Sequence, residues 1–163
     1  MNERGAKMIV ETGTARCGEK NFGGDGGSTI LFGDFATRHN IQAYSVDISQ
    51  ESVNNAQAAT LNYIKNLQVV CADSVAFLKN FPSSIDFLYL DSFDYEYGNP
   101  LPSQWHHLKE IEAAYPKLTE NSIVMIDDCD LPQGGKGPLV IQYLKDRGWK
   151  IAMQGYQVIM VKN

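Results

Sequence analysis

The chain has 163 residues, of which 44% are hydrophobic and 20% are charged, and its formal net charge is −5. This length and composition are typical of a folded protein with a continuous core, so residues 1–163 are predicted to form a single domain. The acidic balance argues against a general nucleic-acid-binding surface, which needs clustered Lys and Arg.

Neither a membrane segment nor a disulfide framework is expected. No apolar run approaches the roughly 18 residues that a membrane-spanning helix needs, and the first residues contain no signal-peptide core. The three cysteines lie far apart without a Cys-x-x-Cys pair, which is typical of reduced thiols. We therefore expect a cytoplasmic protein with no membrane partner.

Apolar strands alternate with helical patterns along the chain. The first half is predicted to form strands at 7–11, 42–46 and 67–71 and helices at 28–38, 50–63 and 74–80. Ser28 and Ser49 are expected to cap the first two helices. The second half is predicted to form strands at 85–90 and 122–126, helices at 103–115 and 139–147, and a closing hairpin of strands 149–153 and 157–162.

This order of elements predicts an α/β protein. Short apolar strands separated by helices favour a mainly parallel sheet that is covered on both faces. The closing hairpin predicts one antiparallel strand near an edge. Two connections, 14–27 and 92–102, are long, and long loops in a compact domain are usually functional or mobile.

A carboxylate closes or follows each of five predicted strands: Glu11, Asp47, Asp73, Asp91 and the pair Asp127–Asp128. Ligands of open α/β sheets bind at the carboxyl ends of the strands, so these residues are predicted to line one cleft. A single Asp is more often a turn former or a helix cap, and it is the repeated position that supports the prediction. The chain contains neither a Gly-x-Gly-x-x-Gly fingerprint nor a P-loop, which weakens a nicotinamide-dependent oxidoreductase and an ATP site.

Four different motifs follow one another along the chain: Val10-Glu11-Thr12-Gly13-Thr14, Tyr44-Ser45-Val46-Asp47-Ile48, Cys71-Ala72-Asp73-Ser74 and Ile85-Asp86-Phe87-Leu88-Tyr89-Leu90-Asp91. In this order they resemble the class I S-adenosylmethionine-dependent methyltransferases over nearly the full chain. The resemblance implies a Rossmann-like three-layer sandwich with a seven-stranded, mostly parallel sheet and one antiparallel strand near the edge. It also implies a cofactor site in which Glu11, Gly13 and Thr14 approach the methionine part, Asp47 holds the ribose, Ile48 packs on adenine, and Asp73 and Ser74 lie beside the adenine amine.

The second half narrows the resemblance. Its segments are Leu90-Asp91-Ser92-Phe93-Asp94-Tyr95, His106-His107-Leu108-Lys109-Glu110 and Ile123-Val124-Met125-Ile126-Asp127-Asp128. They are similar to small-molecule O-methyltransferases of the metal-dependent catechol and macrolide-sugar type, which implies that Asp91, Asp127 and Asp128 bind Mg²⁺. Three neighbouring carboxylates repel one another unless a cation or protonation relieves them, and oxygen ligands suit Mg²⁺. The alternative is that Asp127, Asp128 and Asp130 only form a polar turn.

The group that accepts the proton stays open at this point. The catechol-type enzymes use a lysine three residues after the first metal ligand, where this chain has Asp94. The candidate catalytic residues are therefore Asp91, Asp94 and His107, with His106 as the other histidine. Either histidine has a purely structural alternative. The aromatic residues of the same segment could bind a flat acceptor or anchor the loop: Phe93, Tyr95, Tyr97 and Trp105.

The hypothesis is methyl transfer from S-adenosylmethionine to a small-molecule acceptor, at an oxygen and with Mg²⁺ assistance. Two alternatives are a metal-independent methyltransferase of the same fold and a non-catalytic S-adenosylmethionine-binding module. Such a module would need a homo-oligomer or a partner subunit to complete its acceptor site. The segment Gly134-Gly135-Lys136-Gly137 is predicted to be a flexible flap beside the acidic pair or a solvated turn.

Overall fold

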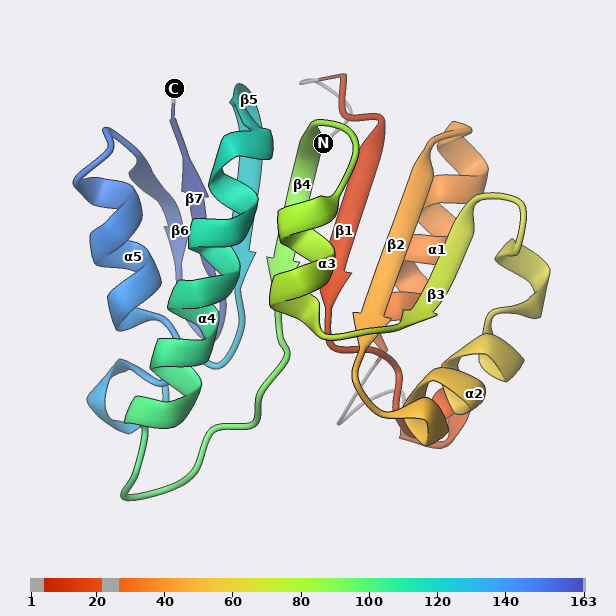
Figure 1. Cartoon of the computed structure of the whole chain (residues 1–163), viewed down its shortest axis with the longest axis horizontal. Helices are drawn as coiled ribbons and strands as arrows, with labels where there is room; N and C mark the ends of the chain where they lie inside the picture. The colour runs from red at the N-terminus through yellow and green to blue at the C-terminus, as the bar shows by residue number, and fades with distance from the viewer. Residues whose placement is uncertain (1–4, 22–26, 163) are drawn as a thin grey trace.

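The computed structural model describes residues 5–21 and 27–162. Within them, a seven-stranded sheet has the strand order β3-β2-β1-β4-β5-β7-β6 (Figure 1). The strands are β1 Met8–Thr12, β2 Gln42–Asp47, β3 Leu67–Cys71, β4 Ile85–Leu90, β5 Leu118–Ile126, β6 Lys150–Gln154 and β7 Val158–Val161. β7 pairs antiparallel with β5 and β6, and the other pairs are parallel. This confirms the predicted Rossmann-like sheet with one antiparallel strand beside the edge.

Helices cover both faces of the sheet. They are α1 Ser28–His39, α2 Gln50–Ala59, α3 Ser74–Asn80, α4 Leu101–Ala114 and α5 Pro138–Lys145, and short 3-10 turns occupy Gly18–Asn21, Leu61–Tyr63, Tyr115–Lys117 and Pro132–Gly134. In Figure 1, α3, α4 and α5 lie in front of the sheet and α1 lies behind it. α2 contacts α1 as well as β2 and β3. The protein is therefore a three-layer sandwich, as predicted.

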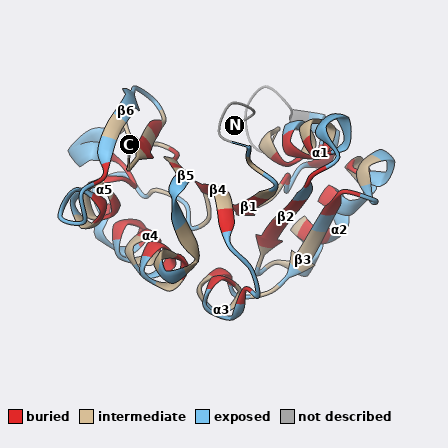
Figure 2. Cartoon of the chain, turned by 90° about the horizontal axis from the view of Figure 1, so that it is seen from above, coloured by how far each residue is buried: buried red, intermediate tan, exposed pale blue. Residues whose placement is uncertain are grey.

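The core follows from the alternation of side chains along the central strands. Val10 and Leu88 point to the face that α3, α4 and α5 cover, and Ile9 and Phe87 point to the face that α1 covers. All four are at most 4% exposed. Figure 2 shows the resulting band of buried residues along the sheet. Each such side chain stabilises the fold by about 1.5–3 kcal/mol, which makes the sheet a rigid base for the loops at its edge.

Two helix starts differ from one another. The Ser49 hydroxyl caps α2 as predicted, because it accepts a hydrogen bond from the backbone N–H of Ser52 at 3.2 Å. Ser28 does not cap α1: it is the first helical residue, and Gly27 takes the cap position without a side-chain bond. No side chain therefore caps the first turn of α1.

Two further element boundaries differ from the predicted ones: the end of α2 and the start of β5. The helix predicted at 50–63 ends at Ala59, where the Thr60 hydroxyl donates a hydrogen bond back to the Ala56 carbonyl at 2.7 Å. β5 begins four residues earlier than expected, because Leu118 pairs with Ile85 across a register shift in β4. The pairing of Leu118 with Ile85 is not visible in the local sequence.

The topology places one edge of the sheet in the position of a ligand site. β1 lies between β2 and β4, so the strand order reverses there, and the carboxyl ends of β1 to β5 share the lower edge in Figure 1. Among the described residues, no helix is both long and apolar enough to cross a membrane.

Candidate functional site: a cleft at the carboxyl edge of the sheet

A cleft of about 410 Å³ opens at the carboxyl ends of β1 to β4. Six of the seven predicted cofactor residues lie in its wall: Gly13, Thr14, Asp47, Ile48, Asp73 and Ser74. The opposite wall comes from the loop after β4 and from α4: Asp91, Ser92, Phe93, Asp94 and His106. The cleft therefore contains residues that are far apart in the chain and that were predicted to meet at the carboxyl ends of the strands.

Gly13 shapes the floor of the cleft. Its φ is +85°, a backbone conformation that residues with a Cβ rarely adopt. A Cβ at this position would lie 2.5 Å from the carbonyl oxygen of Asp91. The Gly13 N–H donates to the carbonyl of Val46 at 2.8 Å, so the turn is held between the ends of β2 and β4. Only glycine fits this close approach.

Glu11 lies beneath the cleft wall and not in it, contrary to expectation. Its side chain is buried, and its Oε2 accepts hydrogen bonds from the hydroxyls of Ser45 at 2.6 Å and Thr29 at 2.7 Å. Burial raises the pKa of Glu11 to about 7, although the surrounding hydroxyls act in the opposite direction. Because Ser45 Oγ also lies 3.0 Å from the carbonyl oxygen of Gly13, Glu11 supports the turn from below.

Asp47 and Asp73 occupy equivalent positions after β2 and β3. Asp47 Oδ1 accepts the N–H of Ser49 at 2.7 Å, which fixes its carboxylate at the cleft. Asp73 caps α3, since its Oδ1 accepts the N–H of Ala76 at 2.8 Å. Both carboxylates thus have a structural bond and also face the cleft. Ile48, next to Asp47, is 74% exposed and provides an apolar surface there.

Asp94, a candidate base, is held by an arginine. Both carboxylate oxygens accept hydrogen bonds from Arg16 at 2.9 Å, a bidentate pair that joins the loops after β1 and β4. The Arg16 hydrogen bonds lower the pKa of Asp94 despite partial burial, so the carboxylate is a weak proton acceptor. The position of Asp94 is therefore better suited to closing the cleft than to catalysis. Arg16 was not anticipated from the sequence.

The two adjacent histidines differ sharply, and the choice of His107 is corrected. His107 is fully buried and its Nδ1 lies 2.7 Å from the Ser103 carbonyl oxygen, so it does not reach the cleft. Burial also lowers the pKa of His107. His106 lies in the cleft wall, and its Nε2 is 3.2 Å from Ser74 Oγ and 3.3 Å from Glu110 Oε1.

Glu110 is a buried carboxylate that the sequence did not reveal. Its Oε1 accepts a hydrogen bond from Ser92 Oγ at 2.7 Å, and its Oε2 accepts one from Thr12 Oγ1 at 3.2 Å. Burial alone would raise the pKa of Glu110, but the hydrogen bond from His106 and the neighbouring histidines lower it. Glu110 therefore ties α4 to the loop after β4 and orients His106.

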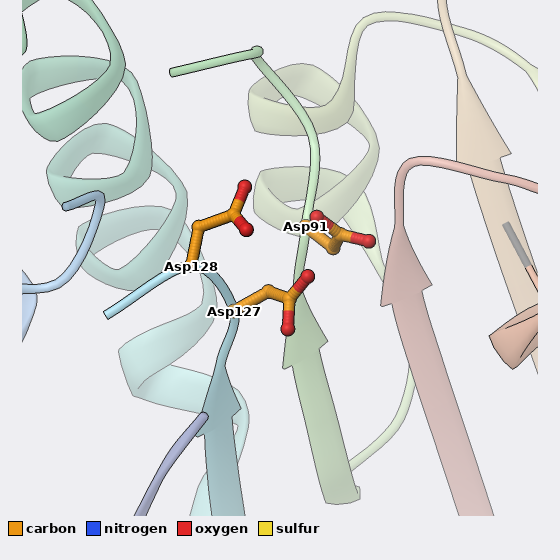
Figure 3. A group of neighbouring side chains, drawn as sticks. All are labelled: Asp91, Asp127 and Asp128. Atoms are coloured by element: carbon orange, nitrogen blue, oxygen red, sulfur yellow. The ribbon is translucent and has the colours of Figure 1, made fainter. Parts of the chain in front are cut away.

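The acidic cluster forms as predicted. Asp91, Asp127 and Asp128 each place a carboxylate oxygen within 4.8 Å of the others, and Figure 3 shows the three side chains converging at the ends of β4 and β5. The turn between β6 and β7 reaches the same place: Gln157 donates a hydrogen bond to Asp127 Oδ1 at 2.9 Å, and the Tyr156 hydroxyl donates one to Asp128. Burial raises the pKa of Asp91 to about 8, with Lys136 opposing the effect and Asp127 adding to it.

A lysine already supplies a positive charge to this cluster. Lys136 Nζ lies 2.9 Å from Asp91 Oδ1, 3.0 Å from Asp128 Oδ2 and 3.4 Å from the Ser92 carbonyl oxygen. The segment lies beside the acidic pair as predicted, but it is not a solvated turn, because Lys136 is only 2% exposed. Burial alone would lower the pKa of Lys136, but the carboxylates of Asp91 and Asp128 outweigh it and raise the pKa. The oxygen ligands suit Mg²⁺, yet in this arrangement an ion could not join them without displacing the ammonium group.

The glycine turn explains how Lys136 reaches the cluster. Gly135 has a φ of +58°, and a Cβ there would collide with the carbonyl oxygen of Asp128. The Gln104 side chain donates a hydrogen bond to the Gly135 carbonyl at 2.9 Å, and the N–H of Lys136 donates to the carbonyl of Asp128 at 3.2 Å. The turn therefore folds back over the acidic pair and directs the lysine inward.

Known proteins share this architecture. The SAH-bound methyltransferase PaMTH1 of Podospora anserina superposes with a TM-score of 0.71 at 11% identity, over 98% of this chain and 73% of that chain. The O-methyltransferase NovP gives 0.71 at 14% identity, over 99% and 74%. A putative rRNA methylase from Clostridium thermocellum gives 0.58 at 13% identity, over 98% and 91%. At these identities the similarity shows the fold alone.

Sequence comparison identifies the family. No curated protein sequence matches the chain. The family described as "Methyltransferase domain" matches residues 22–129, which is more than half of the chain and includes the strand ends that carry Asp47, Asp73, Asp91 and Asp127. With this match, and with the cleft at the carboxyl edge of a methyltransferase-type sheet, the chain belongs to the methyltransferase-domain family.

Proposed function

We propose that the protein transfers the methyl group of S-adenosylmethionine to an oxygen of a small-molecule acceptor. The observation that carries the proposal is the cleft. The turn after β1, Asp47 and Asp73 line one wall of it, and Asp91 lies in the opposite wall. The family match and the SAH bound to PaMTH1, which has the same fold, support it.

The cofactor would lie along the ends of β1, β2 and β3. Asp47 would accept hydrogen bonds from the ribose hydroxyls, because a carboxylate is an acceptor for two such donors. The exposed Ile48 would pack on the adenine ring, with Asp73 and Ser74 at its edge. Gly13 and Thr14, which lie in the cleft wall at the end of β1, would contact the methionine part.

The acceptor would enter on the side of the β4 loop and α4. Its oxygen attacks the methyl carbon, the new O–C bond forms as the C–S bond breaks, and S-adenosylhomocysteine leaves as a neutral thioether. The acceptor proton must pass to a base, and His106 is the histidine in the cleft wall. When His106 Nε2–H donates to Glu110, Nδ1 is the nitrogen that can take the proton.

Magnesium assistance, which the sequence resemblance implies, is not included in the proposed reaction. Asp91, Asp127 and Asp128 would hold such an ion, and it would supply Lewis-acid activation of the acceptor oxygen. Lys136 already neutralises two of these three carboxylates. No step of the proposed reaction therefore passes through a metal.

A small acceptor suits the electrostatics of the site better than RNA does, although rRNA methylases share the fold. The net charge is −5, and at this wall Arg16 pairs with Asp94 and Lys136 pairs with Asp91, so these cations do not form the basic surface that a phosphate backbone needs. Phe93 is 50% exposed in the same wall and stacks near His106 with 5.3 Å between the ring centroids. A flat apolar acceptor could pack on this surface.

Calorimetry with S-adenosylhomocysteine tests the cofactor site. Asp47→Ala should weaken binding about 10- to 100-fold, because a hydrogen bond to a charged group is worth about 1.5–3 kcal/mol. Asp47→Asn keeps an acceptor for the Ser49 N–H and should preserve the fold. Asp146→Asn, an exposed site at the end of α5, is the matched control and should bind like wild type.

Three results would count against the proposal. If wild-type protein shows no binding heat with the cofactor, or if Asp47→Ala binds it unchanged, the cofactor site is wrong. Cofactor binding without turnover across an acceptor panel would favour the alternative of a binding module that needs a partner subunit. Turnover is followed as S-adenosylhomocysteine released.

A further inference from the structure

We infer that Lys136 is the resident cation of the acceptor site: its ammonium group takes the place of a divalent metal ion among Asp91, Asp127 and Asp128. Methyl transfer then needs no metal, and removal of the ammonium group turns the carboxylates into a metal site. The effect on catalysis rests on the proposed function, whereas cation binding at these carboxylates can be measured without it.

The contacts of Lys136 account for all of its hydrogen-bond donors. An ammonium group has three N–H bonds, and Nζ has three oxygen partners: Asp91 Oδ1 at 2.9 Å, Asp128 Oδ2 at 3.0 Å and the Ser92 carbonyl oxygen at 3.4 Å. These oxygens come from the loops after β4 and β5, so the lysine bridges two strand ends. A bridging metal ion would connect the same two loops.

Lys136 is built into this position and does not fold over it from the surface. Its side chain is 2% exposed, whereas most lysines keep the ammonium group in water. Gln104 Nε2 is bonded to the carbonyl of Gly135, and the backbone of Lys136 is bonded to the carbonyl of Asp128. The turn that carries the lysine is thus anchored to α4 and to the end of β5.

The remaining carboxylate is satisfied separately. Asp127 accepts a hydrogen bond from Gln157 at 2.9 Å, and Asp128 has the Tyr156 hydroxyl as a second donor. Every member of the cluster therefore has a donor from the chain itself. Since Lys136 has no free N–H to offer an acceptor, it is a positioning residue that holds Asp91 and Ser92 at the edge of the cleft.

Calorimetry and thermal unfolding with Mg²⁺ test this assignment on protein first treated with EDTA and dialysed. Wild-type protein should give no binding heat with millimolar Mg²⁺ and no change in melting temperature. Lys136→Met keeps the length of the side chain but lacks the charge, and it should bind Mg²⁺ and be stabilised by it. Adding Asp128→Asn to Lys136→Met should abolish that binding. Lys109→Met, at an exposed position on α4, is the control for loss of a charge and should behave like wild type.

Mg²⁺ binding by wild type that disappears in Asp128→Asn would overturn the assignment. A folded Lys136→Met protein that binds no Mg²⁺ would overturn it as well. If Lys136→Met does not fold in the absence of metal, folding on addition of Mg²⁺ supports the assignment, and failure to fold in Mg²⁺ contradicts it. Lys136→Arg retains the positive charge and should continue to exclude Mg²⁺.

Activity provides an independent readout. Wild-type methyl transfer should be unchanged by EDTA. In Lys136→Met, kcat should fall about 10²-fold in EDTA and recover in part with Mg²⁺, while the affinity for S-adenosylhomocysteine stays within about twofold of wild type. A general structural defect would lower both quantities and would not respond to Mg²⁺. If wild type transfers no methyl group under any condition, the proposed function fails, but the Mg²⁺ titrations still decide the role of Lys136.

Discussion

The buried Glu11 should make the stability of the protein depend on pH. Its pKa is about 7 in the folded protein against an ordinary value of 4.5, a difference of about 2.5. At 1.36 kcal/mol for each pKa unit, the linked free energy is about 3 kcal/mol. Because the folded protein binds this proton more tightly than the unfolded chain, the stabilisation is complete below about pH 4.5 and is lost as the pH rises through about 7.

Glu11→Gln removes the titration but keeps a side chain that can bond to the hydroxyls of Ser45 and Thr29. The free energy of unfolding of the Glu11→Gln protein, relative to wild type, should therefore rise by about 3 kcal/mol between about pH 4 and about pH 8. Asp91, whose pKa is also raised, titrates in both proteins and largely cancels in the difference.

Urea unfolding at several pH values measures this difference, with the fluorescence of the buried Trp149 as the probe. Glu51→Gln, at an exposed position in the first turn of α2, is the control and should change the stability by only a few tenths of a kcal/mol. Parallel curves for wild type and Glu11→Gln over the whole pH range would refute the assignment of the raised pKa to Glu11.

Two further substitutions test the cleft itself. Gly13→Ala should lower the melting temperature more than Gly98→Ala, because both positions have a positive φ, but only at Gly13 does the new Cβ lie 2.5 Å from the Asp91 carbonyl oxygen; equal losses would show that the contact is relaxed. His106→Gln should lower the single-turnover rate of methyl transfer about 10²-fold and weaken S-adenosylhomocysteine only a few-fold, through loss of its contact with Ser74, while the exposed His39→Gln should leave both unchanged. An unaltered rate in His106→Gln would assign the proton transfer elsewhere.

The sheet and most of the cleft were predictable because they follow from local patterns. Short apolar strands between helices specify a parallel sheet, and the carboxyl ends of its strands must share one edge. Asp47, Asp73 and Asp91 could therefore be assigned to one cleft without any knowledge of side-chain positions. Gly13 was assigned to the site only through the family resemblance, and its close approach to the Asp91 backbone became visible only in the structure.

The remaining parts of the site depend on tertiary geometry. Adjacent helical residues point about 100° apart, so only the packing of α4 decides that His106 faces the cleft and His107 the core. The inward path of Lys136 depends on the Gly135 turn and on Gln104, which lies 32 positions earlier. One sequence signal could have indicated Lys136. Three carboxylates on adjacent strand ends require a positive charge, and the loop that follows Asp128 contains a lysine between two glycines.

The hairpin of β6 and β7 has a consequence for handling the protein. Its turn supplies Tyr156 and Gln157 to the acidic pair, and the Cys129 N–H donates to the Tyr156 carbonyl at 2.7 Å. β7 runs antiparallel to β5, so this turn lies beside the carboxyl end of β5, whereas Val161, at the other end of β7, lies toward the opposite edge of the sheet (Figure 1). A tag attached after β7 should therefore leave the acidic pair undisturbed, whereas residues inserted into the turn between β6 and β7 should displace both donors.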